Sequence, residues 1–193
     1  MISGVKLLAF AGSARNDSVN KKLVSVAAKG AEEAGAEVTL VDLRDYPLPL
    51  YDGDLEEAEG LPENAKKLKN LFIESDGFLI ACPEYNSSIT PLLKNTIDWV
   101  SRPQEGEPPL VAYKGKVAVL MAASPGGLGG LRGLVHVRAI LGNIGVVVLP
   151  QQHAVPKAYD AFGEDGKLLD AAQQEKVTGL GKSLAKFLAQ HKS

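Results

Sequence analysis

Five short hydrophobic runs recur along the chain, and segments with helical periodicity separate them. The runs cover residues 5–11, 36–41, 77–82, 116–123 and 145–149. Four of them are nearly continuous apolar stretches, as expected of strands that are covered on both faces of a sheet. The run at 36–41 alternates apolar and polar positions, which is typical of a less covered strand near a sheet edge.

The intervening segments predict helices with recognisable ends. Helices are expected at residues 19–34, from Pro62 onward, from Pro91 onward, at about 131–141 and near the C-terminus. A glycine follows the first of these helices, and a proline occupies the first turn of the second and third, as is common at helix ends. Threonine precedes Pro91 and is a suitable N-cap residue.

This alternation of strands and helices predicts an α/β fold with an open parallel sheet and right-handed crossovers. Two proline-bearing segments, residues 42–61 and 102–113, interrupt the rhythm and are expected to be long loops that build a site or an interface. The chain contains no internal repeat or composition shift, so residues 1–193 are expected to form a single domain.

Composition narrows the classes of function. The 193 residues are 45% hydrophobic and carry a formal net charge of −2, with no basic stripe of the kind that binds nucleic acid. No apolar run approaches the roughly 20 residues that span a bilayer, and no cleavage site for a signal peptide precedes the first strand. The single cysteine, Cys82, suits a reducing compartment, so we expect a cytoplasmic protein without membrane insertion.

The loop after the first strand, residues 12–20, reads GSARNDSVN and leads into a helix. Its Ser13, Arg15, Ser18 and Asn20 combine small polar donors and one guanidinium with the free N–H groups of a helix N-terminus, which favours a phosphate site. The segment contains neither a Walker lysine motif nor Gly-x-Gly-x-x-Gly, so a monophosphate fits better than a triphosphate or dinucleotide. An ordinary capped turn, in which Ser18 or Asn20 is structural, is the alternative.

Two further loops follow the third and fourth strands. Residues 83–90, PEYNSSIT, expose backbone groups where strand order is expected to reverse, and these groups suit the donors and acceptors of a flavin's pyrimidine edge. Residues 124–130, SPGGLGG, allow the backbone to approach a flat ring or a phosphate closely. The glycine spacing is one residue off the dinucleotide fingerprint and follows the fourth strand rather than the first, which argues against a dinucleotide site.

These three loops together resemble the NADPH-dependent FMN reductase family. GSARNDSVNKKL resembles the family's phosphate motif, CPEYNSSITPLLKNTIDWVSRP its second signature, and SPGG with the following helix its third. The similarity extends from about residue 6 to about residue 187. The resemblance implies a flavodoxin-like, three-layer doubly wound sandwich with strand order 2-1-3-4-5, usually assembled as a dimer or a homotetramer.

The resemblance also implies a role for each motif residue in non-covalent FMN binding. The implied phosphate ligands are Ser13, Arg15, Ser18 and Asn20. The implied contacts to the ring and ribityl chain are Pro83, Glu84, Tyr85 and Asn86. The residues implied on the other side of the flavin are Ser124, Gly126 and Gly127. The chain departs from the pattern at Ser87, where the family commonly has glycine, and a Cβ there is expected to restrict φ.

The expected activity is electron transfer from NADPH or NADH through FMN to a small acceptor such as a quinone, free flavin, azo compound or chromate. No side chain is assigned a catalytic role, because the flavin itself is the reactive group. A flavodoxin-type electron carrier is the alternative, and a receiver-type signalling domain is disfavoured because Gly12-Ser13 and Cys82-Pro83 stand where acidic residues are needed. The three histidines lack ligand spacing, so no metal site is expected. Cys82 and Trp99 are expected to pack in the core.

Overall fold

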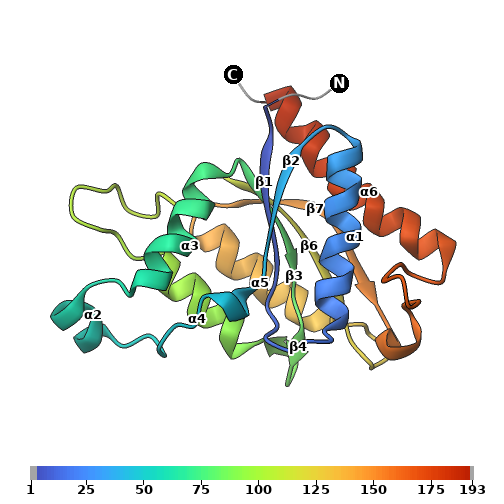
Figure 1. The fold of residues 1–193 in the computed structure, drawn as a ribbon, viewed down its shortest axis with the longest axis horizontal. Coiled ribbons are helices and arrows are strands. Elements are labelled where there is room, and N and C mark those ends of the chain that lie inside the picture. Colours follow the sequence, from blue (N-terminus) through green and yellow to red (C-terminus); the bar gives the residue numbers. More distant parts are fainter. Residues whose placement is uncertain (1–3, 192–193) are drawn as a thin grey trace.

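The computed structural model describes residues 4–191 and contains a five-stranded parallel sheet between two layers of helices (Figure 1). The strands of this sheet are β1 (Lys6–Ala11), β2 (Glu37–Val41), β3 (Gly77–Ala81), β6 (Val117–Ala123) and β7 (Val147–Val155). The helices are α1 (Val19–Glu33), α2 (Gly53–Glu59), α3 (Glu63–Glu74), α4 (Pro91–Val100), α5 (Leu131–Asn143) and α6 (Ala171–His191). The strand order β2-β1-β3-β6-β7 is the predicted 2-1-3-4-5, which confirms the flavodoxin-like fold.

The alternation of side chains along β1 shows how the sheet builds two cores. Leu7 and Ala9 point to the face that α1 and α6 cover, whereas Leu8 and Phe10 point to the face that α3, α4 and α5 cover. Figure 1 shows the two helix layers on opposite sides of the sheet. Because successive strand residues face opposite sides, a strand in the middle layer has to be apolar at nearly every position.

The two helices on one face, α1 and α6, pack unusually closely. A Cβ atom added to Gly30 would lie 2.1 Å from the carbonyl oxygen of Thr178, and one added to Gly181 would lie 1.9 Å from that of Ala27. Real Cβ contacts are not this short, so the two glycines are needed where the helix backbones approach one another. This contact holds the C-terminal half of α1 against α6.

The last strand is longer than predicted, and this changes what reaches the carboxyl end of the sheet. The prediction ended it at residue 149, whereas β7 runs to Val155 with an irregular register between its pairing to Ala118 and its pairing to Leu120. Its polar residues are tolerated because β7 lies at the sheet edge, where one side is exposed to water. A short 3₁₀ helix at Ala158–Asp160 follows.

The first long loop contains a helix that was not predicted. Residues 53–59 form α2, within the segment 42–61 that the sequence predicts to be a long loop. The carboxylate of Asp52 accepts a hydrogen bond from the N–H of Asp54 at 2.9 Å and caps the helix. Asp54 and Glu56 lie in the first turn, where negative side chains interact favourably with the positive end of the helix. Together with the cap, this interaction explains why α2 forms although none of its side chains is buried.

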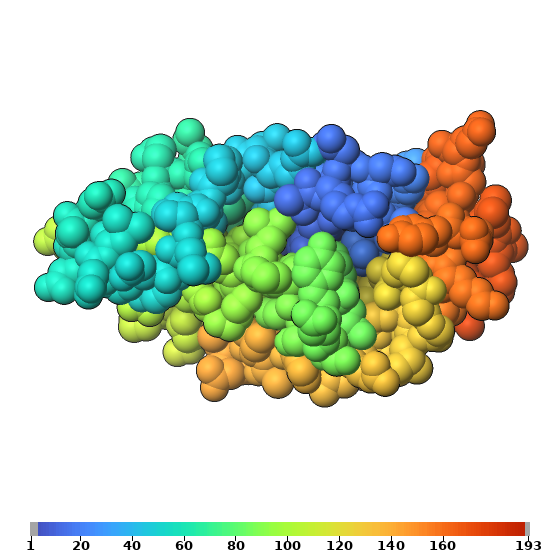
Figure 2. Space-filling view, turned by 90° about the horizontal axis from the view of Figure 1, so that it is seen from below, coloured from blue at the N-terminus to red at the C-terminus, as the bar shows by residue number. Residues whose placement is uncertain are grey.

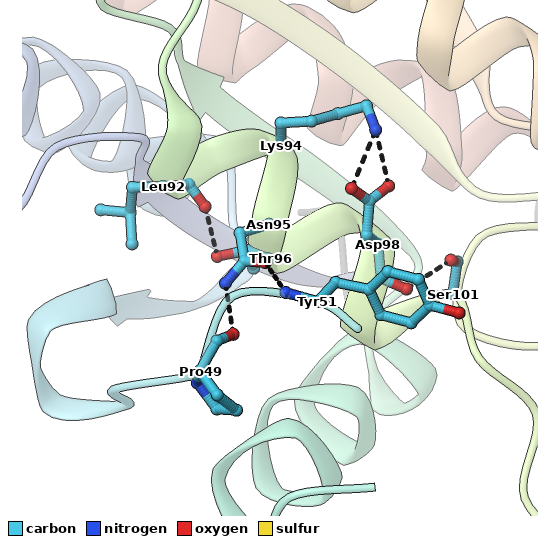
Figure 3. Close-up of polar contacts among 8 residues, drawn as sticks. All are labelled: Pro49, Tyr51, Leu92, Lys94, Asn95, Thr96, Asp98 and Ser101. Atoms are coloured by element: carbon cyan, nitrogen blue, oxygen red, sulfur yellow. Dashed lines mark hydrogen bonds and ion pairs between the residues drawn. The ribbon is translucent and has the colours of Figure 1, made fainter. Parts of the chain in front are cut away.

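Both long loops are fastened to the body of the protein, and Figure 3 shows the contacts of Pro49 and Tyr51, in the first of them, with Asn95. Asn95 of α4 accepts a hydrogen bond from the N–H of Tyr51 and donates one to the carbonyl of Pro49, each at 2.8 Å, and the indole of Trp99 donates to the same carbonyl at 2.8 Å. Trp99 is fully buried, as predicted. The buried ammonium of Lys69 pairs with Glu107, which fastens the second loop to α3.

Candidate functional site

A cleft opens at the carboxyl ends of β1, β3 and β6. Figure 2 views this face, where the blue, green, yellow and orange segments of the chain meet around a shallow hollow. The predicted site residues that line the cleft are Ser13, Arg15, Ser18, Asn20, Pro83, Glu84, Tyr85 and Ser124. Asn86, Gly126 and Gly127 lie in the same loops but do not line it. The cleft therefore occupies the place where the strand order reverses, as the fold rule requires.

The N-terminus of α1 presents unengaged donors to the cleft. Ser18 is the N-cap residue with an extended backbone, but its side chain makes no capping hydrogen bond, although it is only 4% exposed. The first-turn N–H groups of a helix have no partner within the helix, and no acidic residue stands in this first turn. The positive end of the helix and the free hydroxyl are therefore suited to an anion.

The exposed guanidinium of Arg15 lies at the mouth of the cleft. Its Nη1 donates to the hydroxyl of Tyr159 at 3.4 Å, and this contact raises the pKa of Arg15, so the group is always charged. Asp17 brings a negative charge nearby, but its carboxylate pairs with Lys22 at 2.7 Å, and that pair lowers the pKa of Asp17. An anion that enters the cleft therefore meets the positive charge of Arg15, since the charge of Asp17 is offset by Lys22.

Tyr159 is a lining residue that sequence reasoning missed. It stands in the 3₁₀ helix after β7, is 62% exposed and contributes one wall of the cleft. No motif marks it, and only the extension of β7 to Val155 brings it beside Arg15. The cleft consequently has an exposed tyrosine on each of two sides, because Tyr85 is also 52% exposed.

Asn20 is buried and already holds two hydrogen bonds. Its Nδ2 donates to the carbonyl of Ala123 at 2.8 Å, and its Oδ1 accepts from the N–H of Ala123 at 2.9 Å. This pairing joins the start of α1 to the end of β6. The side chain of Asn20 therefore holds the first and third loops together, in line with the structural alternative that the sequence left open.

The second loop is a small antiparallel hairpin rather than an irregular segment. Its strands are β4 (Glu84–Tyr85) and β5 (Ser88–Ile89), joined by a two-residue turn in which Asn86 has φ 51° and Ser87 has φ 64°. Both residues are left-handed, which is the backbone of a type I′ turn, and glycine is favoured after asparagine in such a turn. Ser87 adopts this conformation at an energetic cost.

The four glycines of the third loop divide into two pairs. Gly129 and Gly130 have positive φ values, and an added Cβ would lie 2.6 Å from the backbone of Val155 or 2.8 Å from Ala122. Gly126 and Gly127 face open space, where an added Cβ would meet nothing closer than 3.9 Å. The first pair is therefore required by packing, whereas the second pair leaves room beside the cleft.

Cys82 directly precedes the hairpin but is a core residue. Its side chain is fully buried, and burial strongly raises the pKa of the thiol, which keeps it protonated and unreactive. The predicted packing role is confirmed. Across residues 4–191, no group of three or more potential metal ligands is found, and no helix is long and apolar enough to cross a membrane.

The donor set of this cleft fits the phosphate of a flavin mononucleotide, with a free hydroxyl, a charged guanidinium and a helix N-terminus on one side. Residues 5–160 match the model of the NADPH-dependent FMN reductase family. The chain belongs to this family. The predicted resemblance is thereby confirmed, and the protein is an oxidoreductase.

Similar proteins match the chain over nearly its whole length. It is 34% identical over 178 residues to an NAD(P)H-dependent FMN reductase of Pseudomonas aeruginosa, a match that covers 92% of this chain and 91% of the relative. It is 29% identical to a quinone reductase of Escherichia coli, with 97% of each chain covered. The structure superposes on a flavoenzyme NAD(P)H:acceptor oxidoreductase of Paracoccus denitrificans with a TM-score of 0.81 at 30% identity, covering 97% of this chain and 99% of that one.

Proposed function

We propose that the cleft binds FMN non-covalently and that the protein uses it to oxidise NADPH or NADH and to reduce a small acceptor. The acceptor class that we favour is a quinone or a free flavin, because relatives along the whole chain bear those names. Azo compounds and chromate are further acceptors for the same cleft. The observation that carries the proposal is the N-cap Ser18, which lines the cleft and whose hydroxyl makes no capping hydrogen bond.

The phosphate of FMN would lie against the first turn of α1. There the hydroxyls of Ser13 and Ser18 and the guanidinium of Arg15 surround a helix N-terminus. Charge-assisted hydrogen bonds of this kind are about twice as strong as neutral ones. Asn20 supports this turn from behind through its bonds to Ala123 rather than by adding another donor.

The ring system would lie between the second and third loops. Backbone groups of Pro83, Glu84, Tyr85 and Asn86 would pair with its polar edge, and the exposed ring of Tyr85 would cover part of its face. Ser124, Gly126 and Gly127 would close the other side, where the glycines leave open space. Tyr159 joins this site as an additional wall.

FMN, when bound, supplies the redox chemistry by taking up a hydride from the nicotinamide and releasing two electrons to the acceptor. The residues of the chain hold the flavin and the reactant that lies against it in position. No side chain is needed as an acid or base. Both reactants would use the same open face of the cleft in turn. The wall that they share is formed by the exposed tyrosines at positions 85 and 159.

An anaerobic absorbance experiment tests this function. The purified protein loaded with FMN is mixed with NADPH and, separately, with NADH, and the flavin bands are followed with time. Bleaching within seconds, followed by recovery on adding a quinone, is the expected result. A flavin that stays oxidised without a partner enzyme would instead indicate an electron carrier, and a protein that stays colourless with FMN would contradict the proposal entirely.

We also propose that the chain forms one domain, assembles as a homodimer or homotetramer, and works in the cytoplasm. Apolar side chains remain exposed on and near α5, namely Leu128, Leu131 and Val135, which supports a contact between subunits. The single buried cysteine supports a reducing compartment. Light scattering at several protein concentrations measures the assembly, and a monomer at all of them would contradict it.

A further inference from the structure

We propose that Glu84 is a positioning residue that fastens the hairpin of β4 and β5 onto the N-terminus of α5. It thereby sets where Tyr85 stands relative to the glycine loop. This inference rests on the proposed function, since the hairpin would hold the edge of the flavin ring. It departs from the family resemblance, which makes Glu84 a direct contact to the cofactor.

The first observation is the cap of α5. Its N-cap residue is Gly130, which has no side chain to satisfy the N–H groups of the first turn. The carboxylate of Glu84 reaches across from the hairpin, and its Oε2 accepts a hydrogen bond from the N–H of Gly133 at 2.9 Å. A negative charge at this end of a helix is favourable, so the cap is supplied by a residue 49 positions away in sequence.

The second observation is the direct contact between hairpin and helix. A Cβ added to Gly133 would lie 3.4 Å from the carbonyl oxygen of Ser88 and 3.6 Å from the side chain of Glu84. One turn further along the same face of α5, Nδ1 of His136 lies 2.9 Å from the hydroxyl of Ser88. The hairpin is thus joined to α5 at both of its strands.

The hairpin needs such an external support. Two-residue strands are too short to be stable alone, and the turn places two residues with a Cβ in the left-handed region. Tyr85 contributes little packing, since about half of its surface is exposed. One carboxylate oxygen of Glu84, Oε2, is engaged with Gly133, and through this bond Glu84 fixes the position of Tyr85 and Asn86 beside a bound flavin.

Two variants separate positioning from direct contact. Glu84→Gln keeps a carbonyl oxygen that can accept from the N–H of Gly133 but removes the charge, whereas Glu84→Ala removes the cap altogether. A matched control is Asp170→Ala, which removes a carboxylate that caps the start of α6 by accepting from the N–H groups of Ala172 and Gln173, away from the cleft.

The measurements are the affinity for FMN, the visible circular dichroism of the bound flavin, and amide exchange of residues 84–89 without flavin. Glu84→Ala is expected to weaken FMN binding about tenfold, to change the flavin dichroism and to speed exchange in the hairpin. Glu84→Gln is expected to restore most of all three properties. Asp170→Ala is expected to lower the melting temperature while leaving FMN affinity unchanged.

Several results would overturn the inference. Unchanged affinity and unchanged hairpin exchange in Glu84→Ala would show that the cap does not position the hairpin. If Glu84→Gln binds FMN as weakly as Glu84→Ala, the charge itself acts on the cofactor. If Glu84→Ala fails to fold, Glu84→Asp shortens the side chain so that its carboxylate no longer reaches the N–H of Gly133, and unchanged hairpin exchange there also contradicts the inference. If the unmodified protein binds no FMN, the proposed function fails, and hairpin exchange alone decides on the cap.

Discussion

Ser18→Ala separates phosphate binding from ordinary helix capping. A serine at an N-cap normally stabilises its helix, and replacing it with alanine costs typically about 1 kcal/mol of folding free energy. In this protein the Ser18 hydroxyl makes no capping hydrogen bond, so that loss is absent. We therefore expect the unfolding free energy of the flavin-free variant to stay within about 0.5 kcal/mol of the unmodified protein.

The affinity for FMN should respond very differently. Ser18 is 4% exposed and would donate a hydrogen bond to a charged phosphate, an interaction worth about 1.5–2 kcal/mol. This corresponds to a loss of about 10- to 30-fold in FMN affinity. Adding Arg15→Ala should weaken binding further, and more strongly at low ionic strength, because the exposed guanidinium is screened by salt.

Riboflavin, which lacks the phosphate, is the matched ligand for this test. Titrations that follow flavin fluorescence give both dissociation constants for each protein. The unmodified protein should prefer FMN, and the preference should largely disappear in the double variant while riboflavin affinity stays the same. A double variant that still prefers FMN to riboflavin as strongly as before would refute the placement of the phosphate. A large loss of stability in flavin-free Ser18→Ala would refute the claim that the Ser18 hydroxyl is not used as a helix cap.

Three other outcomes follow from the structure. Ser87→Gly should stabilise the protein by about 0.5–1 kcal/mol in denaturant unfolding, because glycine adopts the left-handed turn without strain; an unchanged midpoint would contradict this. Gly181→Ala should lower the melting temperature by several degrees, since its Cβ would collide with the Ala27 carbonyl, whereas Gly179→Ala on the open side of α6 should not. Burial and Lys176 lower the pKa of His153, so the unfolded state binds its proton more readily; stability should fall as pH drops below about 6.5, and His153→Gln should flatten that slope.

The strand pattern and the position of the site were accessible from the chain alone. Continuous apolar runs mark strands that are buried on both faces, so the alternation of these runs with helices identified a parallel sheet, and the family resemblance supplied its strand order. Loop composition then located the cleft, because parallel strands end at a common edge. The serines at positions 13 and 18 and the arginine at 15 lie there, as the motif indicated.

Only the tertiary structure decided which of the motif residues are free to bind a ligand and which are held by other parts of the chain. The bonds from Asn20 to Ala123 join positions 103 apart, and the contact of Arg15 with Tyr159 joins positions 144 apart. The local sequence pattern does not predict such pairs, because each side chain contacts the partner that the packing of the sheet and helices brings within reach. For the same reason a serine that resembles an ordinary helix cap is left with a free hydroxyl, and a glutamate in a ligand motif caps a helix from another part of the chain.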